Sequence, residues 1–390
     1  MKICILTPRF PFPENGGDIV RINGVCRYLK NKGHSLILVS FCSKFDIKNK
    51  NNLPESIYDK IYYIKRNGII SIINSLFALL INKPMQIGYY FSIKYLFRFK
   101  KIVKEEKPDI FISHLLRMVP YLNICHLQER SIVDFPDVFS KIYDLSKLSY
   151  NLSLKKIIYF FEKNLILTYE QKTIALYKKC VLVSRSDKEY LGNPDSVFVY
   201  SNGVQYVPVV HDNYNHNKMV FIGNMRTVQN QDAVKYFVND IFPIIKISIP
   251  EAVFYIIGAE PPADIINLSD NKNIIVTGYV DSVENAIIDS SVAVAPIRIA
   301  SGIQNKVLIA MACGIPVILT RIISMSIPEL KTRENCIIAD EKQEIADAVV
   351  FVMKNIDIRN KIGKSGYELV KTVYSWEKQL NGYESGIKAD

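Results

Sequence analysis

Short apolar runs and one amphipathic stretch alternate in the first 41 residues. Residues 2–6 form an apolar run typical of a buried strand, and apolar residues from Ile19 to Leu29 recur at the spacing of one helix face. Gly33 is expected to end that helix before a second strand at residues 34–41. Further strands, separated by long helical stretches, are expected at residues 109–113, 131–134 and 181–184. This alternation predicts a parallel sheet covered by helices on both faces.

A second series of apolar runs follows a segment rich in turn-forming residues at 192–204. Its strands are expected at residues 219–223, 252–258, 273–277, 291–296 and 316–320. The pattern predicts an α/β protein with two doubly wound parallel sheets, whose ligands bind at the carboxyl ends of the strands. We expect one domain over residues 1–195 and a second over 204–373, with a terminal helix at 374–390 that completes the first.

The composition excludes disorder and argues against a membrane-spanning segment. Of the 390 residues 49 % are apolar, which is enough to build cores for two or three domains. The longest uncharged stretch, residues 68–82, is shorter than the ~20 apolar residues that a spanning helix needs. The N-terminus lacks the ~7–15-residue apolar region of a signal peptide, so we expect a cytoplasmic protein. The seven cysteines are isolated from one another, and we expect free thiols without a disulfide framework or metal site.

The net charge of +11 is concentrated in the first half of the chain. Residues 1–195 carry 31 Lys and Arg against 17 Asp and Glu, whereas the remainder is slightly acidic. Residues 60–104 contain nine basic residues, no acidic one, and interleaved aromatic residues. A nucleic acid, an anionic membrane surface or a phosphorylated acceptor would each explain this basic stretch.

Two strand-end loops carry candidate anion-binding chemistry. Gly16 and Gly17 close the loop after the first strand and open a helix, whose free N–H groups and dipole favour an anion. In the second half a loop precedes a helix with Lys306 in its first turn, and the backbone N–H groups at 302–305 could cradle a diphosphate. Ordinary strand-to-helix turns are the alternative at both places.

Two polar residues end strands of the first sheet. His114 is expected at the strand end, where an imidazole could donate a hydrogen bond to a departing phosphate oxygen. A histidine hydrogen-bonded within its own loop is the alternative. Asp134 ends the next strand and could contact acceptor hydroxyls or cap a helix.

The order of several motifs resembles the retaining nucleotide-sugar glycosyltransferases of family 4, which have the two-domain GT-B fold. The matching segments are PRFPFPENGGD (8–18), GHSLILVSF (33–41), VDFPD (133–137), VSRSD (183–187), SNGV (201–204), FIGNM (221–225), VTGYVDSVENAI (276–287), GIQNKVLIAMACGIPVI (302–318) and YSW (374–376). The QNK variant is similar to bacterial transferases that build exopolysaccharide and O-antigen repeats. The resemblance implies two Rossmann-like domains that face a central cleft.

The resemblance also implies roles for residues of both domains. Lys306 and Arg226 would stabilise the leaving diphosphate without a metal or other cofactor, and His114 would touch the donor sugar or its phosphate. Backbone groups at Tyr279 and Val280 would meet the base. The other donor-site positions are Gly223, Ser301, Gly302, Ile303, Gln304, Asn305 and Ile309, and the loop of the first domain contributes Gly16, Gly17 and Asp134.

Both glutamates that the family usually carries are replaced. Ser301 stands where the first reads the donor sugar, and Ile309 where the second reads the nucleotide ribose. One charge-assisted hydrogen bond contributes ~1.5–3 kcal/mol, so the loss of the second glutamate should weaken donor binding by about 10- to 150-fold unless other contacts replace it.

The resemblance thus implies a retaining glycosyltransferase in lipopolysaccharide, capsule or exopolysaccharide synthesis. Its partners would be a UDP- or GDP-sugar and a lipid-diphosphate-linked glycan, and the basic stretch would attach it peripherally to the anionic inner face of the cytoplasmic membrane. The alternatives are a non-hydrolysing nucleotide-sugar epimerase and a catalytically impaired, transferase-like binding subunit. Nucleic-acid binding is disfavoured because the basic stretch adjoins an apolar run and no recognised module is present.

Overall fold

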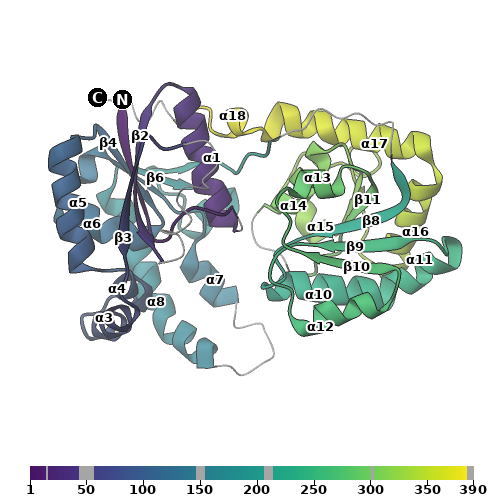
Figure 1. Ribbon diagram of the computed structural model, residues 1–390, viewed down its shortest axis with the longest axis horizontal. Coiled ribbons are helices and arrows are strands. Elements are labelled where there is room, and N and C mark those ends of the chain that lie inside the picture. Colours follow the sequence, from purple (N-terminus) through teal and green to yellow (C-terminus); the bar gives the residue numbers. More distant parts are fainter. Residues whose placement is uncertain (15, 44–56, 146–153, 206–213, 300–302, 384–390) are drawn as a thin grey trace. The chain divides into compact units, whose positions relative to one another are not determined.

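The computed structural model describes residues 1–14, 16–43, 57–145, 154–205, 214–299 and 303–383, which form two compact units (Figure 1). The first unit contains residues 1–201 and the residues from Leu380 onward, and the second contains Asn202–Gln379. Each unit is a parallel sheet with helices packed on it, as the alternating pattern predicts.

The first unit is built on a seven-stranded parallel sheet in the order β3-β2-β1-β4-β5-β6-β7. Its strands are β1 (Lys2–Thr7), β2 (Ser35–Cys42), β3 (Lys60–Lys65), β4 (Ile110–His114), β5 (Ser131–Asp134), β6 (Lys179–Leu182) and β7 (Val197–Val199). Its helices are α1 (Gly17–Asn31), α3 (Gly68–Leu80), α4 (Met85–Tyr89), α5 (Ile93–Glu106), α6 (Val119–Ile124), α7 (Phe139–Leu145), α8 (Leu154–Leu176) and α9 (Arg185–Tyr190), with 3-10 turns at Leu116–Met118 and Gln128–Arg130. The central strands β1, β2 and β5 are buried apart from the first residues of β1 and β2, which explains why their sequences are mostly apolar.

The second unit is built on a six-stranded parallel sheet in the order β10-β9-β8-β11-β12-β13. Its strands are β8 (Asn215–Ile222), β9 (Val253–Ile257), β10 (Ile274–Gly278), β11 (Ser290–Ala295), β12 (Val317–Leu319) and β13 (Ile337–Ile338). Its helices are α10 (Val228–Tyr236), α11 (Phe242–Ser248), α12 (Ala263–Ile266), α13 (Val283–Ile287), α14 (Asn305–Ala312), α15 (Arg321–Ser324), α16 (Lys342–Lys354), α17 (Ile356–Leu369) and α18 (Trp376–Gln379). Single π-helical turns lie at Phe237–Ile241 and Val370–Tyr374, and a 3-10 turn at Asn267–Asp270.

The expected boundary between the units needs two corrections. The first unit does not stop at residue 195, because β7 pairs with β6 and the unit runs on to Ser201. Residues 374–379 belong to the second unit, because Gly203 packs against the backbone of Trp376 so closely that an added Cβ would lie 2.3 Å from its Cα. The chain returns to the first unit only at Leu380.

The expectations about a membrane-spanning helix and about the cysteines can be compared with this fold. Among the described residues, no helix is both long enough and apolar enough to cross a bilayer. All seven cysteines are free, and all except Cys125 are buried.

Candidate functional site

Each sheet has one point where the strand order reverses. In the first unit β1 and β4 are neighbours although the chain winds away from them in opposite directions, and in the second unit the same holds for β8 and β11. Loops diverge at such a point, and ligands of open α/β sheets bind there, outside the carboxyl ends of the strands. The residues that follow these strands are therefore the candidates in each unit.

The loop after β1 leads into helix α1 through Gly16. Gly16 has extended backbone and precedes the helix, and a Cβ added there would lie 2.8 Å from Nη2 of Arg9. Arg9 forms an ion pair with Asp18 in the first turn of α1. Burial acts to raise the pKa of Asp18, but the Arg9 hydrogen bond and nearby positive charges lower it below its usual value. The helix N-terminus thus already has a carboxylate beside it, whereas Gly17 has open space around its Cα.

His114 lies at the end of β4 and only 2 % of its surface is exposed. Burial lowers the pKa of its imidazole, although the nearby carboxylates of Asp134 and Asp18 act to raise it. Among the described residues, neither ring nitrogen has a hydrogen-bond partner. An unpaired buried polar group costs ~1–3 kcal/mol, so the imidazole retains hydrogen-bonding capacity that the described protein does not use.

Asp134 has a different environment from the one expected of an acceptor-binding residue. Its carboxylate is fully buried and accepts a hydrogen bond from Nη2 of Arg21 at 3.0 Å and from the hydroxyl of Tyr383 at 3.1 Å. Arg21 also donates to the carbonyl oxygen of Ser201 at 3.0 Å. In the structure the polar atoms of Asp134 join α1, β5 and the C-terminal segment, and its contact with acceptor hydroxyls stays a prediction. Arg21 was not expected from the sequence. The feature that could have identified it is its place beside the apolar residues of α1.

In the second unit the turn after β8 depends on glycine. A Cβ added to Gly223 would lie 2.6 Å from Nδ2 of Asn230, and one added to Gly258 would lie 1.9 Å from the carbonyl oxygen of Gly223. Asn230, in helix α10, also donates to the carbonyl oxygen of Asn224 at 2.8 Å. Gly223 therefore lets the turn approach both α10 and the end of β9, and Asn230 becomes fixed beside the turn.

Lys306 meets this turn from the first turn of helix α14. Its ammonium donates to Oδ1 of Asn230 and lies 4.9 Å from the ring centroid of Phe221 in β8. Burial lowers the pKa of Lys306 to about 7. The structure thus brings together Gly223, Asn230 and Lys306 at the switch point, and of these Asn230 was not expected from the sequence.

The other residues near the start of α14 differ in their surroundings. Gln304 precedes the helix with extended backbone, and Oδ1 of Asn305 is buried without a partner among the described residues. Ile303 and Ile309 are half-buried and pack against the hydrophobic core of the unit. Ser301 and Gly302 lie outside the described residues.

The remaining donor-site candidates are Arg226, Tyr279 and Val280. The side chain of Arg226 is 75 % exposed, and its Nη1 lies 3.6 Å from Oε2 of Glu260. Tyr279 is 53 % exposed and Val280 packs against the core, both after β10 at the edge of the sheet. Among the described residues, no group of three or more His, Cys, Asp or Glu side chains is arranged to hold a metal ion.

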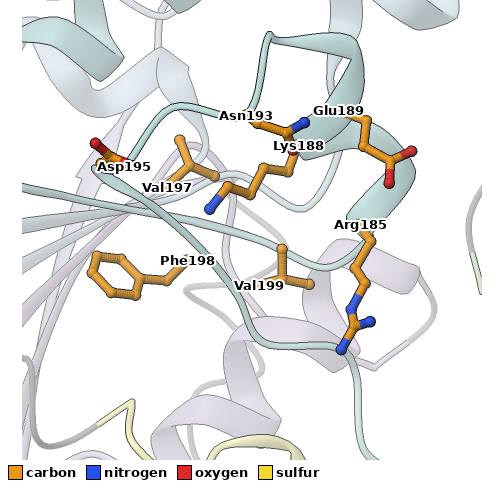
Figure 2. A pocket seen from close by; sticks show the side chains of 8 residues that line it. All are labelled: Arg185, Lys188, Glu189, Asn193, Asp195, Val197, Phe198 and Val199. Atoms are coloured by element: carbon orange, nitrogen blue, oxygen red, sulfur yellow. The ribbon is translucent and has the colours of Figure 1, made fainter.

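A pocket of about 390 Å³ lies on the first unit (Figure 2). It lies between α9 and the edge strand β7, which β5 and β6 separate from β4. It is lined by Arg185, Lys188, Glu189, Asn193, Asp195, Val197, Phe198 and Val199. Because it lies far along the sheet from the switch point, we give it no part in the site.

Residues 216–355 match the family model described as Glycosyl transferases group 1. The matched segment runs from β8 to the end of α16, so it contains both the Gly223 turn and the first turn of α14. No curated protein matches the sequence.

Several solved structures are similar to the whole chain. A mutant of TarM from S. aureus, crystallised with UDP among its ligands, has a TM-score of 0.71 at 12 % identity and 100 % coverage of both chains. WaaG, described as a glycosyltransferase involved in lipopolysaccharide biosynthesis, has a TM-score of 0.66 at 10 % identity, also with 100 % coverage of both. HepE from Anabaena in complex with UDP-glucose has a TM-score of 0.63 at 10 % identity, with 99 % of each chain covered.

At such low identities the likeness shows the fold alone. The chain has the GT-B fold, with the two parallel-sheet α/β domains that the sequence predicts. The fold and the family match over the second unit together support a glycosyltransferase of the GT-B type.

Proposed function

We propose that this chain is a retaining glycosyltransferase of family 4, which moves a sugar from a nucleoside diphosphate sugar to a lipid-linked glycan during synthesis of a bacterial surface polysaccharide. The observation that carries the proposal is the position of Lys306. It is a cation in the first turn of a helix at the switch point of the sheet, inside the segment that matches Glycosyl transferases group 1. A diphosphate there would meet free backbone N–H groups, a positive helix end and an ammonium.

The chemistry that these groups supply is stabilisation of the leaving group. When the bond from the sugar to the phosphate breaks, negative charge collects on the nucleoside diphosphate, and fixed cations and N–H groups lower the barrier. The second unit has no Asp-x-Asp pair at a strand end, so we expect Lys306 and Arg226 to balance this charge without a divalent cation. His114 is the candidate hydrogen-bond donor of the first unit, because its ring nitrogens have no partner among the described residues.

The acceptor and the membrane are the finer parts of the proposal. WaaG is described as acting in lipopolysaccharide biosynthesis, and the likeness to it favours a glycan acceptor on a lipid. The basic stretch at residues 60–104 would be attracted to anionic lipid headgroups, by about 1 kcal/mol for each Lys or Arg near the surface. We therefore propose peripheral attachment to the inner face of the cytoplasmic membrane.

A transfer assay tests the proposed function. The full chain is incubated with UDP- and GDP-sugars and a bacterial lipid extract, and both the released nucleoside diphosphate and the labelled lipid are measured. We expect release that depends on the lipid, persists in EDTA, and gives a product with the anomeric configuration of the donor. An epimer formed from the donor alone would assign the chain to the epimerases. Donor binding with no turnover on any acceptor would assign it to the binding subunits.

A further inference from the structure

Helix α3 (Gly68–Leu80) has its apolar side chains on the outside of the protein. The apolar face of α3 consists of six side chains that are each between 57 % and 81 % exposed: Ile69, Ile72, Ile73, Leu76, Phe77 and Leu80. They recur at intervals of three and four residues, so they form one continuous stripe along the helix. A surface helix of a globular protein normally buries such a stripe.

The inner face of α3 is made of small and polar residues. Ser71, Ser75 and Ala78 are buried, and the hydroxyl of Ser75 donates to the carbonyl oxygen of Met85 at 3.0 Å. Gly88 of α4 lies so close that an added Cβ would be 2.3 Å from the carbonyl oxygen of Asn74. This tight contact fixes which way α3 faces, so the exposed stripe is a consequence of packing.

Basic residues lie on both sides of α3 along the chain. From residue 60 to 104 the chain carries nine basic residues and no acidic one. Lys83 follows the end of α3, and helix α5 adds Lys94 and Arg98 together with two exposed apolar side chains, Ile93 at 64 % and Phe97 at 67 %. The exposed apolar helix is therefore flanked by basic segments on both sides along the chain.

We propose that α3 is an interfacial helix that inserts its apolar face among the acyl chains of an anionic bilayer, while the surrounding Lys and Arg side chains contact the lipid phosphates. The charge pattern favours this occupant, because a second copy of the chain would bring two sets of basic flanking segments together. At 13 residues α3 is too short to span a bilayer, so it lies in the plane of the interface.

This inference rests on the proposed function only in placing the enzyme at the membrane that carries its acceptor. It adds an apolar contribution that attraction between charges does not supply. Binding by charge alone disappears as salt screens it, whereas an inserted helix keeps part of its affinity.

The test is vesicle co-sedimentation of the full chain, without donor or acceptor, so its outcome is independent of transfer activity. Vesicles contain phosphatidylcholine with or without phosphatidylglycerol. The double variant Ile73→Ser, Phe77→Ser is compared with the control Ile247→Ser, Met325→Ser, which removes two even more exposed apolar side chains from the second unit. We expect the α3 variant to bind anionic vesicles about tenfold more weakly or worse, and the control to bind like wild type.

Depth of insertion gives a second measurement that does not depend on affinity. Phe77→Trp and Ile247→Trp each add one tryptophan to the natural Trp376. Brominated lipids should quench the first variant more than the second. Equal quenching of both, binding of the α3 double variant at the wild-type level, or complete release of wild type by high salt would overturn the insertion. A dimer that the α3 variant abolishes, with vesicle binding unchanged, would assign the face to a second copy instead.

Discussion

Lys306 combines a position suited to binding an anion with burial that opposes its charge. Its pKa is about 7 in the folded chain but near its ordinary value of about 10.5 in the unfolded chain, so between these values the unfolded state holds a proton that the folded state has lost. Stability must then rise with pH across this window. Lys306→Gln keeps a donor for Asn230 and removes the charge, so we expect a higher melting temperature than wild type.

The increase in melting temperature caused by Lys306→Gln should be larger near pH 6 than near pH 9, because the buried charge destabilises the wild type fully only below the pKa that Lys306 has in the folded chain. Thermal melts of both proteins at the two pH values measure this. A variant that melts below wild type at both values would show that the ammonium stabilises the fold.

A substitution of His114 tests its structural role and its functional role separately. Its pKa is lowered by burial, so the unfolded state binds a proton more readily, and wild-type stability falls as pH drops through about 6.5. His114→Phe removes this pH dependence and the two unpaired nitrogens, so it should melt no lower than wild type. If the imidazole assists the reaction, transfer should fall by about 100-fold or more. Wild-type turnover by a stable His114→Phe protein would leave His114 with no role.

For single residues, the sequence predicts the place in a strand or helix better than the surroundings of the side chain. The sequence identifies Lys306 as a site residue because it lies at the start of a helix that follows a strand. Its altered pKa depends on its surroundings, which include Phe221 and Asn230 from distant segments. Asp134 ends a strand as expected, yet its burial depends on Arg21 and Tyr383, which pattern alone does not connect.

At the scale of elements, the contact between α3 and α4 depends on the absence of a side chain at Gly88. Gly88→Ala would place a Cβ 2.3 Å from the carbonyl oxygen of Asn74 and 2.6 Å from Cβ of Ala78, so the two helices must move apart. We expect a loss of about 1–3 kcal/mol in the free energy of unfolding. Gly68→Ala, where nothing lies within 4 Å of the added atom, is the control and should be neutral or slightly stabilising. Equal denaturant midpoints for the two variants would refute this close packing.

Periodicity identified the long, buried elements and missed short or half-exposed ones. The strands β1, β2, β4 to β6 and β8 to β12 overlap strands expected from the sequence, and the central ones are apolar runs because helices cover both faces of a parallel sheet. The edge strand β3 is half-buried with Lys at both ends, and β7 and β13 have three and two residues; none of these three strands was expected from the sequence. The exposure of the apolar face of α3 could not be predicted either, because periodicity shows that an apolar stripe exists but not whether it is buried.

At the scale of the whole molecule, the first unit depends on residues from the far end of the chain. Leu380 and Tyr383 are fully buried in it, and the carbonyl oxygen of Tyr383 accepts from Nζ of Lys179 at 2.9 Å. A chain ending at Gln379 should lose about 3 kcal/mol or more of stability in the first unit, whereas Tyr383→Phe, which loses one hydrogen bond, should lose about 1–2 kcal/mol. Calorimetry should show a lowered transition for the first unit and an unchanged one for the second. A truncated chain that melts like the full chain would contradict this dependence.

The central claim is that the second unit binds the diphosphate of a nucleotide sugar at the start of α14. Titration calorimetry with UDP-glucose tests it most directly, because the esterified diphosphate does not itself titrate near neutral pH. We expect wild type to bind about tenfold more weakly near pH 8 than near pH 6, since above its pKa of about 7 Lys306 must first take up a proton. Lys306→Gln should bind about 10- to 150-fold more weakly near pH 6 and show no such pH dependence. Wild-type affinity in Lys306→Gln, with the pH dependence retained, would contradict the account.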